Sequence, residues 1–554
     1  HVIASEAGVQ QGGPLGPLMF SLATIDLFNS FKEQFPDDIF MNIFYLDDGM
    51  IVCELDKVQD IMDFIVSESA KIGLKVNVSK CSVFSPHHEK LDFSHLQDIQ
   101  IIRDEGIKIL GSPVGSREYI STFVLDHIRK QKRLIELIQQ LDDLHLEFPL
   151  MKHCSSLNKV NHLLRTCPSA YIQDALQEYD DYFNDVFDRF ASVPLTPQQR
   201  ELFNLPTIHN GLGFQKASDV APIAYYSAAI DSYDLCKKLD PNYYMDDMVH
   251  SELLSFQSTW QNDTLIESLS LNTVPFKYGT QHHITQRMNS KKFEKFNCWI
   301  SSTDVYTKAT QQNVQDANLG KLFVPNPCVH RGTYLDSVQF SILIRRLLAH
   351  RVIIQQENRI CPTCFTNDND LNGIHALNCK NGETQTHSRH TEITRFVAQF
   401  IRSCGFTVTL EKNGGYGTRE RPGDIHLPIG INNQKSLFID VTVGNPLNTS
   451  NNQALQSVSD SSYVLDLKVK KKISNYRENV ESAPLLNQEF QVFAISTFGL
   501  IHKDGMKLLR KISKLQPGLS PSESRLSLEE FILRLQFLMM KITGNQISSR
   551  SLLA

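Results

Sequence analysis

Two adjacent carboxylates, Asp47 and Asp48, stand between two apolar stretches and constrain the fold more than any other feature of the chain. The stretches Met41–Tyr45 and Gly49–Cys53 have the length of short strands, so the sequence predicts a hairpin with both aspartates at its bend. Aspartates are common in turns because they satisfy local backbone donors. Two neighbouring carboxylates also concentrate negative charge, which is costly unless a divalent cation neutralises it. The pattern fits an ordinary turn or a metal site that handles phosphates.

The length and composition indicate a folded protein with several domains. A chain of 554 residues is too long for one hydrophobic core. Its net charge of −6 argues against a protein that coats nucleic acid without specificity, although local basic grooves are compatible with it. No apolar run has the length of a membrane span, so we expect no membrane partner. Because the chain begins at His1 inside what proves to be a motif, we interpret it as a fragment.

Further motifs surround the acidic pair. The loop Gln10–Pro17 (QQGGPLGP) lies upstream, and the segments Gly73–Cys81 (GLKVNVSKC) and Leu110–Gly115 (LGSPVG) lie downstream. With the acidic pair, these motifs resemble in order and spacing the palm of reverse transcriptases, particularly those of non-LTR retrotransposons.

The resemblance implies roles for individual residues. Asp47 would bind the catalytic metals with help from Asp48, and Lys80 would lie near the phosphates. The segment Leu110–Gly115 would correspond to the primer grip. The chemistry needs two divalent cations, Mg²⁺ (or Mn²⁺), together with deoxynucleotides, an RNA template and a DNA primer. The loop residues expected to contact the incoming nucleotide and template are Gln11, Gly12, Pro14 and Gly16.

Two departures from the family pattern bear on polymerase activity. Gly13 stands where the family usually has aspartate. The strand that carries the family's first metal-binding aspartate would precede this loop, and we find none in the sequence. One carboxylate pair from a single turn does not hold two metal ions in the required geometry. We therefore expect the polymerase to be inactive in this chain.

A group of soft metal ligands follows in the second half of the chain. Cys361 and Cys364 form a CxxC knuckle, and His375 and Cys379 follow closely. Zinc prefers thiolate and imidazole ligands in a closed tetrahedron, so the spacing predicts a structural Zn²⁺ site rather than a chance group of cysteines. The site resembles the CCHC finger that precedes the nuclease in non-LTR elements with a restriction-like endonuclease. Weaker alternative ligands are Cys328 and His387.

Two further aspartates adjoin apolar strands. Asp424 ends the tetrapeptide RPGD before a strand, and Asp440 lies within the strand Leu437–Val443. They are either surface residues at strand ends or, with a carboxylate from the preceding helix, a metal nest for phosphodiester hydrolysis. Together with the segments around Glu392 and Lys472, they resemble the PD-(D/E)XK, or restriction-like, endonuclease fold.

That resemblance implies that Asp424 and Asp440 bind Mg²⁺ and that Glu392, or less favourably Glu411, supplies a further carboxylate. The family's lysine two positions after the second acid is replaced here by Thr442. We expect Lys472, with Lys468 as the alternative, to orient water and stabilise the transition state instead. The basic residues of this helix are either a solvated face or, as we favour, a phosphate contact: Lys468, Lys470, Lys471, Lys472 and Arg477.

Residue spacing also predicts individual elements. It favours helices over Pro17–Phe31 and Val58–Ile72 and a strand over Leu74–Val78. Ser527 and Glu530 have the spacing of a capping box before a C-terminal amphipathic helix.

We therefore predict an α+β multidomain chain. The resemblance implies an RNA-directed DNA polymerase whose endonuclease nicks a DNA target in the nucleus, so that the exposed 3′ hydroxyl primes copying of the element's RNA. Two alternatives remain: a stand-alone metal-dependent DNA endonuclease, and a nucleic-acid-binding relic without catalysis. The predicted domains are a partial reverse-transcriptase palm (1–120), a helical thumb or linker (121–345), a small CCHC zinc finger (346–386), an α/β restriction-endonuclease-like domain (387–515) and a C-terminal helix (516–554).

Overall fold

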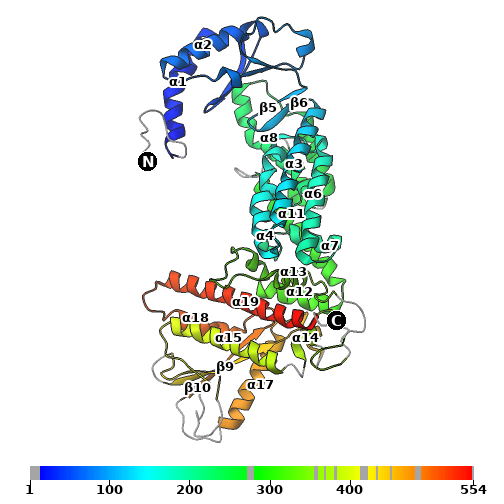
Figure 1. Ribbon diagram of the computed structural model, residues 1–554, viewed down its shortest axis with the longest axis vertical. Coiled ribbons are helices and arrows are strands. Elements are labelled where there is room, and N and C mark those ends of the chain that lie inside the picture. The colour runs from blue at the N-terminus through cyan, green and yellow to red at the C-terminus, as the bar shows by residue number, and fades with distance from the viewer. Residues whose placement is uncertain are drawn as a thin grey trace. The chain divides into compact units, whose positions relative to one another are not determined.

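The computed structural model separates into two compact units. The first contains residues 1–127 and 170–172, and the second contains residues 128–169 and 173–554. Figure 1 shows their helices and strands. Within the described part of the chain, every helix is too short or too polar to traverse a lipid bilayer. The structure describes residues 13–261, 263–270, 280–354, 360–366, 370–379, 383–411, 422–431, 435–448, 452–480 and 488–551.

The first unit begins with the predicted helix, hairpin and second helix. Helix α1 (Gly16–Gln34) precedes the antiparallel strands β1 (Ile39–Tyr45) and β2 (Asp48–Cys53), and helix α2 (Val58–Lys71) follows. Pro17 stands in the first turn of α1, where its missing N–H costs nothing. These elements enclose a small aromatic core. Its fully buried members are Phe31, Phe35 and Ile61.

The strand predicted over Leu74–Val78 is wrong. Residues 74–77 are irregular and lead into a short 3₁₀ turn, Val78–Lys80, and a strand forms only at β3 (Ser82–Phe84). The Asn77 carbonyl accepts the Lys80 N–H at 3.0 Å, and its side chain accepts the Ser79 hydroxyl at 2.7 Å. Such local bonds offer the backbone an alternative to a strand ladder.

Two small strand pairs complete this unit. Strand β3 pairs in parallel with β4 (Gln100–Ile102), and β5 (Gly106–Ile109) pairs antiparallel with β6 (Ser112–Gly115). The two residues between β5 and β6, Leu110 and Gly111, have φ values of 46° and 89°. A two-residue hairpin turn requires such left-handed conformations.

The first part of the second unit is helical, as the sequence predicts. Its core is aromatic: the Phe148 ring lies 5.7 Å from Phe190, 5.5 Å from Phe214 and 5.8 Å from Phe340. The principal helices are α3 (Arg117–Gln139, which begins in the first unit), α4 (Leu144–Leu150), α6 (Gln173–Ala191), α7 (Pro197–Asn204), α8 (Ala217–Leu239), α9 (Asp247–Thr259), α11 (Thr280–Ser301), α12 (Val305–Ala317) and α13 (Ser337–Leu347).

A four-stranded mixed sheet lies in the C-terminal part of the second unit. Its strand order is β10-β9-β8-β7, with antiparallel pairing from β7 to β9 and parallel pairing between β9 and β10. A parallel connection needs a crossover, which helix α17 provides. The elements in chain order are α15 (Glu383–Ser403), β7 (Thr409–Leu410), β8 (Ile425–Leu427), β9 (Ser436–Gly444), α17 (Tyr463–Val480) and β10 (Gln488–Ser496).

Helices cover both faces of this sheet. Val492 and Ala494 of β10 pack against Leu465 of α17. Phe493 lies between them in sequence and approaches helix α18 (Lys503–Ser513). Because successive strand residues point to opposite faces, α17 and α18 must lie on opposite sides of the sheet. Figure 1 shows the same arrangement.

The last helix, α19 (Pro521–Ser551), begins about two turns earlier than predicted. The Ser520 N–H donates to Glu523 Oε2 at 2.8 Å, and the Glu523 N–H donates to Ser520 Oγ at 3.3 Å. Ser527 and Glu530 lie inside the helix, so the predicted capping box is wrong. The same serine-to-glutamate spacing occurs at Ser520, where a following proline also favours a helix start.

Side-chain hydrogen bonds join helix α19 to helices that are distant in the sequence. Gln339 of α13 donates to the side chain of Asn545 at 2.7 Å, and Arg389 of α15 donates to Gln546 at 3.1 Å. The C-terminal helix is therefore integrated into the second unit.

Candidate active sites and metal centre

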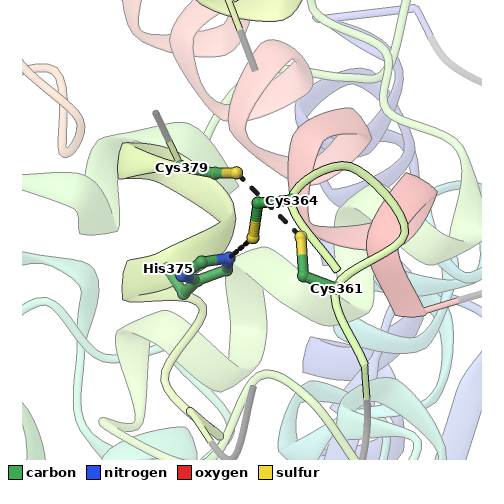
Figure 2. Close-up of side chains that lie close together, drawn as sticks. All are labelled: Cys361, Cys364, His375 and Cys379. Carbon is green, nitrogen blue, oxygen red and sulfur yellow. Dashed lines mark hydrogen bonds between the residues drawn. The ribbon is translucent and has the colours of Figure 1, made fainter. Parts of the chain in front are cut away.

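The structure brings the four predicted soft ligands together. The ligand atoms of Cys361, Cys364, His375 and Cys379 all lie within 4.8 Å of one another (Figure 2). Cys361 Sγ is 4.0 Å from Cys379 Sγ, and Cys364 Sγ is 3.3 Å from His375 Nε2. A zinc tetrahedron with bonds of about 2.3 Å to sulfur has edges of about 3.8 Å, so this donor set fits Zn²⁺. Within the described residues, the cluster includes neither Cys328 nor His387.

Local hydrogen bonds hold these ligands in place. The Cys361 N–H donates to the Thr366 carbonyl at 2.9 Å, which closes the knuckle. The His375 N–H donates to the Asp370 carboxylate at 2.7 Å, which fixes the start of the short helix that carries His375. A hydrogen bond from Thr366 lowers the pKa of the Cys364 thiol to about 7. The thiolate is the form that binds metals, so the environment favours the ligating state.

An apolar core supports the metal centre. It joins α13, the short helix α14 (Ile374–Asn378) and α19, which are drawn close together in Figure 1. The cluster is therefore part of the second unit. The core residues are Ile342, Val352, Ile353, Ala376, Leu377 and Ile547.

The sheet brings Asp424 and Asp440 together. The Asp424 N–H donates to the Ile439 carbonyl at 3.0 Å, and Asp424 Oδ2 accepts the Val441 N–H at 2.7 Å. These bonds join Asp424 to the residues directly before and after Asp440 on β9. The two carboxylates therefore lie close enough to influence each other's pKa. Lys472 of α17 completes the group, since its Nζ lies 3.1 Å and 2.9 Å from the two oxygens of Asp440.

The two aspartates have different electrostatic environments. Burial raises the pKa of Asp440 to about 6, and the neighbouring Asp424 adds to the shift while Lys472 opposes it. Burial also acts on Asp424, but the hydrogen bond and charge of His390, with smaller contributions from Asp440 and the Val441 N–H, outweigh it and lower its pKa. Two buried carboxylates in contact disfavour double ionisation, and a divalent cation would relieve that cost. The donor set therefore fits Mg²⁺ or Mn²⁺.

His390 is the residue of this site that the sequence did not predict. Its Nε2 lies 3.1 Å from Asp424 Oδ2 and 3.1 Å from the Val441 carbonyl oxygen. Glu392, which was expected to supply the carboxylate, is exposed and accepts a hydrogen bond from Ser388. Two residues along a helix are about 200° apart, so His390 and Glu392 cannot face the same neighbour.

A signal for His390 was present in the helix pattern. Ile393 and Val397 are fully buried, and they follow His390 by three and seven positions. This spacing places His390 on the buried face of α15. The alternative carboxylate, Glu411, donates its backbone N–H to the Asp424 carbonyl at 2.9 Å, while its side chain is exposed.

The acidic pair of the first unit lies at the tip of a hairpin, as predicted. Tyr45 pairs with Asp48, so the turn consists of Leu46 and Asp47. Leu46 adopts a left-handed conformation with φ 56°. Both aspartates are exposed, which leaves their carboxylates accessible to a metal ion and a nucleotide.

The other residues predicted for the polymerase site that the structure describes belong to the first unit as well. Pro14 is an exposed turn residue, and Gly16 begins α1 with its N–H bonded to the Gly13 carbonyl at 3.0 Å. Lys80 is exposed at the end of its 3₁₀ turn. Gln11 and Gly12 lie outside the described residues.

Comparison with known proteins supports the polymerase resemblance. Residues 1–114 match the family model "Reverse transcriptase (RNA-dependent DNA polymerase)". The "Retrotransposable element SLACS 132 kDa protein" of Trypanosoma brucei gambiense is 22% identical over 228 residues, which are 41% of this chain and 19% of that protein. The match thus spans about a fifth of the relative's length. The first finding makes residues 1–114 similar to reverse transcriptases, and the second makes the chain similar to a protein of a retrotransposable element.

The reverse-transcriptase match includes the acidic hairpin and the motif with Lys80. It ends at residue 114, within β6, and so also contains the tight turn at Leu110 and Gly111. The zinc-fitting cluster and the group around Asp440 lie beyond the matched segment.

Proposed function

We propose that this chain acts as part of a non-LTR retrotransposon reverse transcriptase and that its second unit carries a metal-dependent DNA endonuclease. The endonuclease would nick a DNA target in the nucleus, and the nick would prime copying of an RNA template. The meeting of Asp424, Asp440 and Lys472 supports the endonuclease, because two carboxylates and a cation from separate elements converge at one place. The sequence of elements from α15 to β10 is consistent with a restriction-like fold.

Each residue of the group would have a defined task in phosphodiester hydrolysis. A divalent cation held by Asp424 and Asp440 would activate water and offset charge on the phosphate. Lys472 lies against Asp440, where its ammonium group can orient the water and stabilise the developing negative charge. His390 and the Val441 N–H fix the direction of the Asp424 carboxylate.

The other two sites would serve the same overall reaction. Asp47 and Asp48, both exposed at the hairpin tip, would hold Mg²⁺ that in turn contacts the phosphates of a deoxynucleotide. Because this single carboxylate pair is not expected to hold both catalytic metals, we propose that the polymerase itself is inactive in this chain. The cluster of Cys361, Cys364, His375 and Cys379 would bind Zn²⁺ in a structural role, because all four donors are used in a closed site.

A plasmid-nicking assay tests the endonuclease. With Mg²⁺, we expect the wild-type chain to nick supercoiled DNA and the Asp440→Asn variant to lose roughly 100-fold or more of that rate, since one metal ligand is weakened. Lys472→Met should have a similar effect. Lys541→Met is the control, because Lys541 is an exposed lysine of helix α19, outside the candidate site and its basic helix. Equal nicking by the wild type and Asp440→Asn would refute the proposal, and DNA binding without nicking would favour a non-catalytic relic.

A further inference from the structure

Helix α18 carries a row of five exposed cations. We call Lys503, Lys507, Arg510, Lys511 and Lys514 the basic row. Successive members lie one to four residues apart, and all five fall on one side of the helix, with Lys514 directly after its last residue. The opposite side is buried through Leu508, Leu509 and Ile512. The row therefore extends for about 16 Å on a helix that packing holds firmly.

Most of the positive charge in the row is not compensated. Lys507 Nζ lies 3.6 Å from Asp504, the single acidic residue of the helix, and Lys503 Nζ lies 3.8 Å from Asp466 of α17. Among the described residues, Arg510, Lys511 and Lys514 make no ion pair. This concentration stands out in a chain whose net charge is −6.

The helix dipole does not account for the basic row. Cations are favourable near a helix C-terminus, which explains Arg510 and Lys511. The same dipole disfavours a cation in the first turn, where Lys503 lies, and its effect has faded at Lys507. The dipole therefore accounts for the C-terminal cations of the row but not for Lys503 or Lys507.

The basic row is separate from the candidate active site. Lys472 and the other lysines of α17 lie on one face of the sheet, and α18 covers the opposite face. The row thus forms a second basic surface.

We infer that the basic row binds the phosphate backbone of duplex DNA. Cations that follow one side of a helix over several turns complement the line of phosphates along a nucleic-acid backbone, and contacts of this kind carry no sequence information. The choice of duplex DNA as the polyanion rests on the proposed function, whereas the surface itself is defined by charge and geometry.

Salt-dependent binding tests the inference on the full chain. Affinity for a 30-base-pair duplex is measured by fluorescence anisotropy over a range of salt concentrations without added Mg²⁺. The triple variant Arg510→Gln, Lys511→Gln, Lys514→Gln should bind roughly 10- to 100-fold more weakly, and its log–log salt slope should be shallower by about 3. The matched control removes the same charge from elsewhere in the second unit with Lys237→Gln, Lys238→Gln and Lys321→Gln.

Three outcomes would overturn the inference. In the first, the triple variant binds the duplex as tightly as the wild type. In the second, the control variant loses as much duplex affinity as the triple variant. In the third, the triple variant loses affinity only for single-stranded RNA of the same length. Nicking is measured separately, so the two proposals can fail independently. A chain that never nicks but loses duplex binding in the triple variant would keep the basic row as a DNA surface.

Discussion

His390 and Asp424 are joined by a 3.1 Å contact between Nε2 and Oδ2, and the same ring nitrogen lies 3.1 Å from the Val441 carbonyl oxygen. The hydrogen bond to Asp424 raises the pKa of His390. His390 thus positions a carboxylate that we propose as a metal ligand. We expect His390→Ala to slow Mg²⁺-dependent nicking by roughly 10- to 100-fold, the usual cost of losing a partner of a metal ligand.

The neighbouring Glu392 provides the matched control for that measurement. Its side chain is exposed and bonded to Ser388, so Glu392→Gln should nick at the wild-type rate. A Mg²⁺ titration should show a higher half-saturating concentration for His390→Ala only. If Glu392→Gln were the slower variant, the assignment of the site in this structure would be wrong.

Zinc content can be measured directly. The purified chain should contain one equivalent of Zn²⁺, and Cys361→Ser should lose it and melt at a lower temperature, because metal binding that needs all four folded ligands stabilises the folded state. Cys298→Ser is the control, since Cys298 is an exposed thiol outside the cluster. Retention of a full equivalent of zinc by Cys361→Ser would exclude the site.

His145 should make the second unit sensitive to acid. Burial lowers the pKa of His145 to about 4, and its Nδ1 accepts the Leu335 N–H at 2.9 Å, which requires the neutral ring. A folded pKa below the unfolded value of about 6.5 means that stability is complete above pH 6.5 and declines as the pH falls toward 4. The loss between pH 7 and pH 5 should be about 2 kcal/mol.

Thermal melting at these two pH values checks the acid sensitivity. The apparent Tm of the wild type should fall more than that of His145→Gln, whose side chain does not titrate. His330→Gln, at an exposed histidine, should behave as the wild type does. Identical pH dependence in all three proteins would show that His145 does not control the transition.

The start of α19 can be tested with two serine substitutions. Ser520→Ala removes the acceptor for the Glu523 N–H and should cost about 1 kcal/mol of folding free energy. Ser527→Ala lies inside the helix and should change stability by less than about 0.5 kcal/mol. Urea denaturation of both variants gives the comparison, and the reverse order would place the cap at Ser527.

The sequence predicted those parts of the fold that depend on local pattern. The hairpin at Asp47, the helix α2 and the long strand β9 follow from residue spacing over short ranges. The strand predicted from Leu74 failed because hydrogen bonds made by Asn77 favour a turn. The capping motif was ambiguous because the same serine-to-glutamate spacing occurs twice within eleven residues, at Ser520 and at Ser527.

In the candidate sites, too, sequence spacing predicted the residues that are close together in the chain but not those that packing brings together. The spacing of the cysteines and His375 predicted the four side chains that the structure brings together as a candidate metal site. His390 was missed because its role depends on which side of α15 meets β9, and that is decided by the packing of Ile393 and Val397. The contact of Lys472 with Asp440 joins residues 32 positions apart, and only the family resemblance suggested it.

The burial of Ile547 beside Val352 and Leu377 has a practical consequence for anyone who wishes to express part of this protein. A shortened clone that stops at residue 515 would omit Ile547 and expose the apolar core next to the cysteine cluster to water. Such a product is expected to precipitate or lose its metal even if every ligand is retained. A recombinant C-terminal fragment should therefore include the whole of α19. It should also include α13, because Ile342 of α13 belongs to the same core.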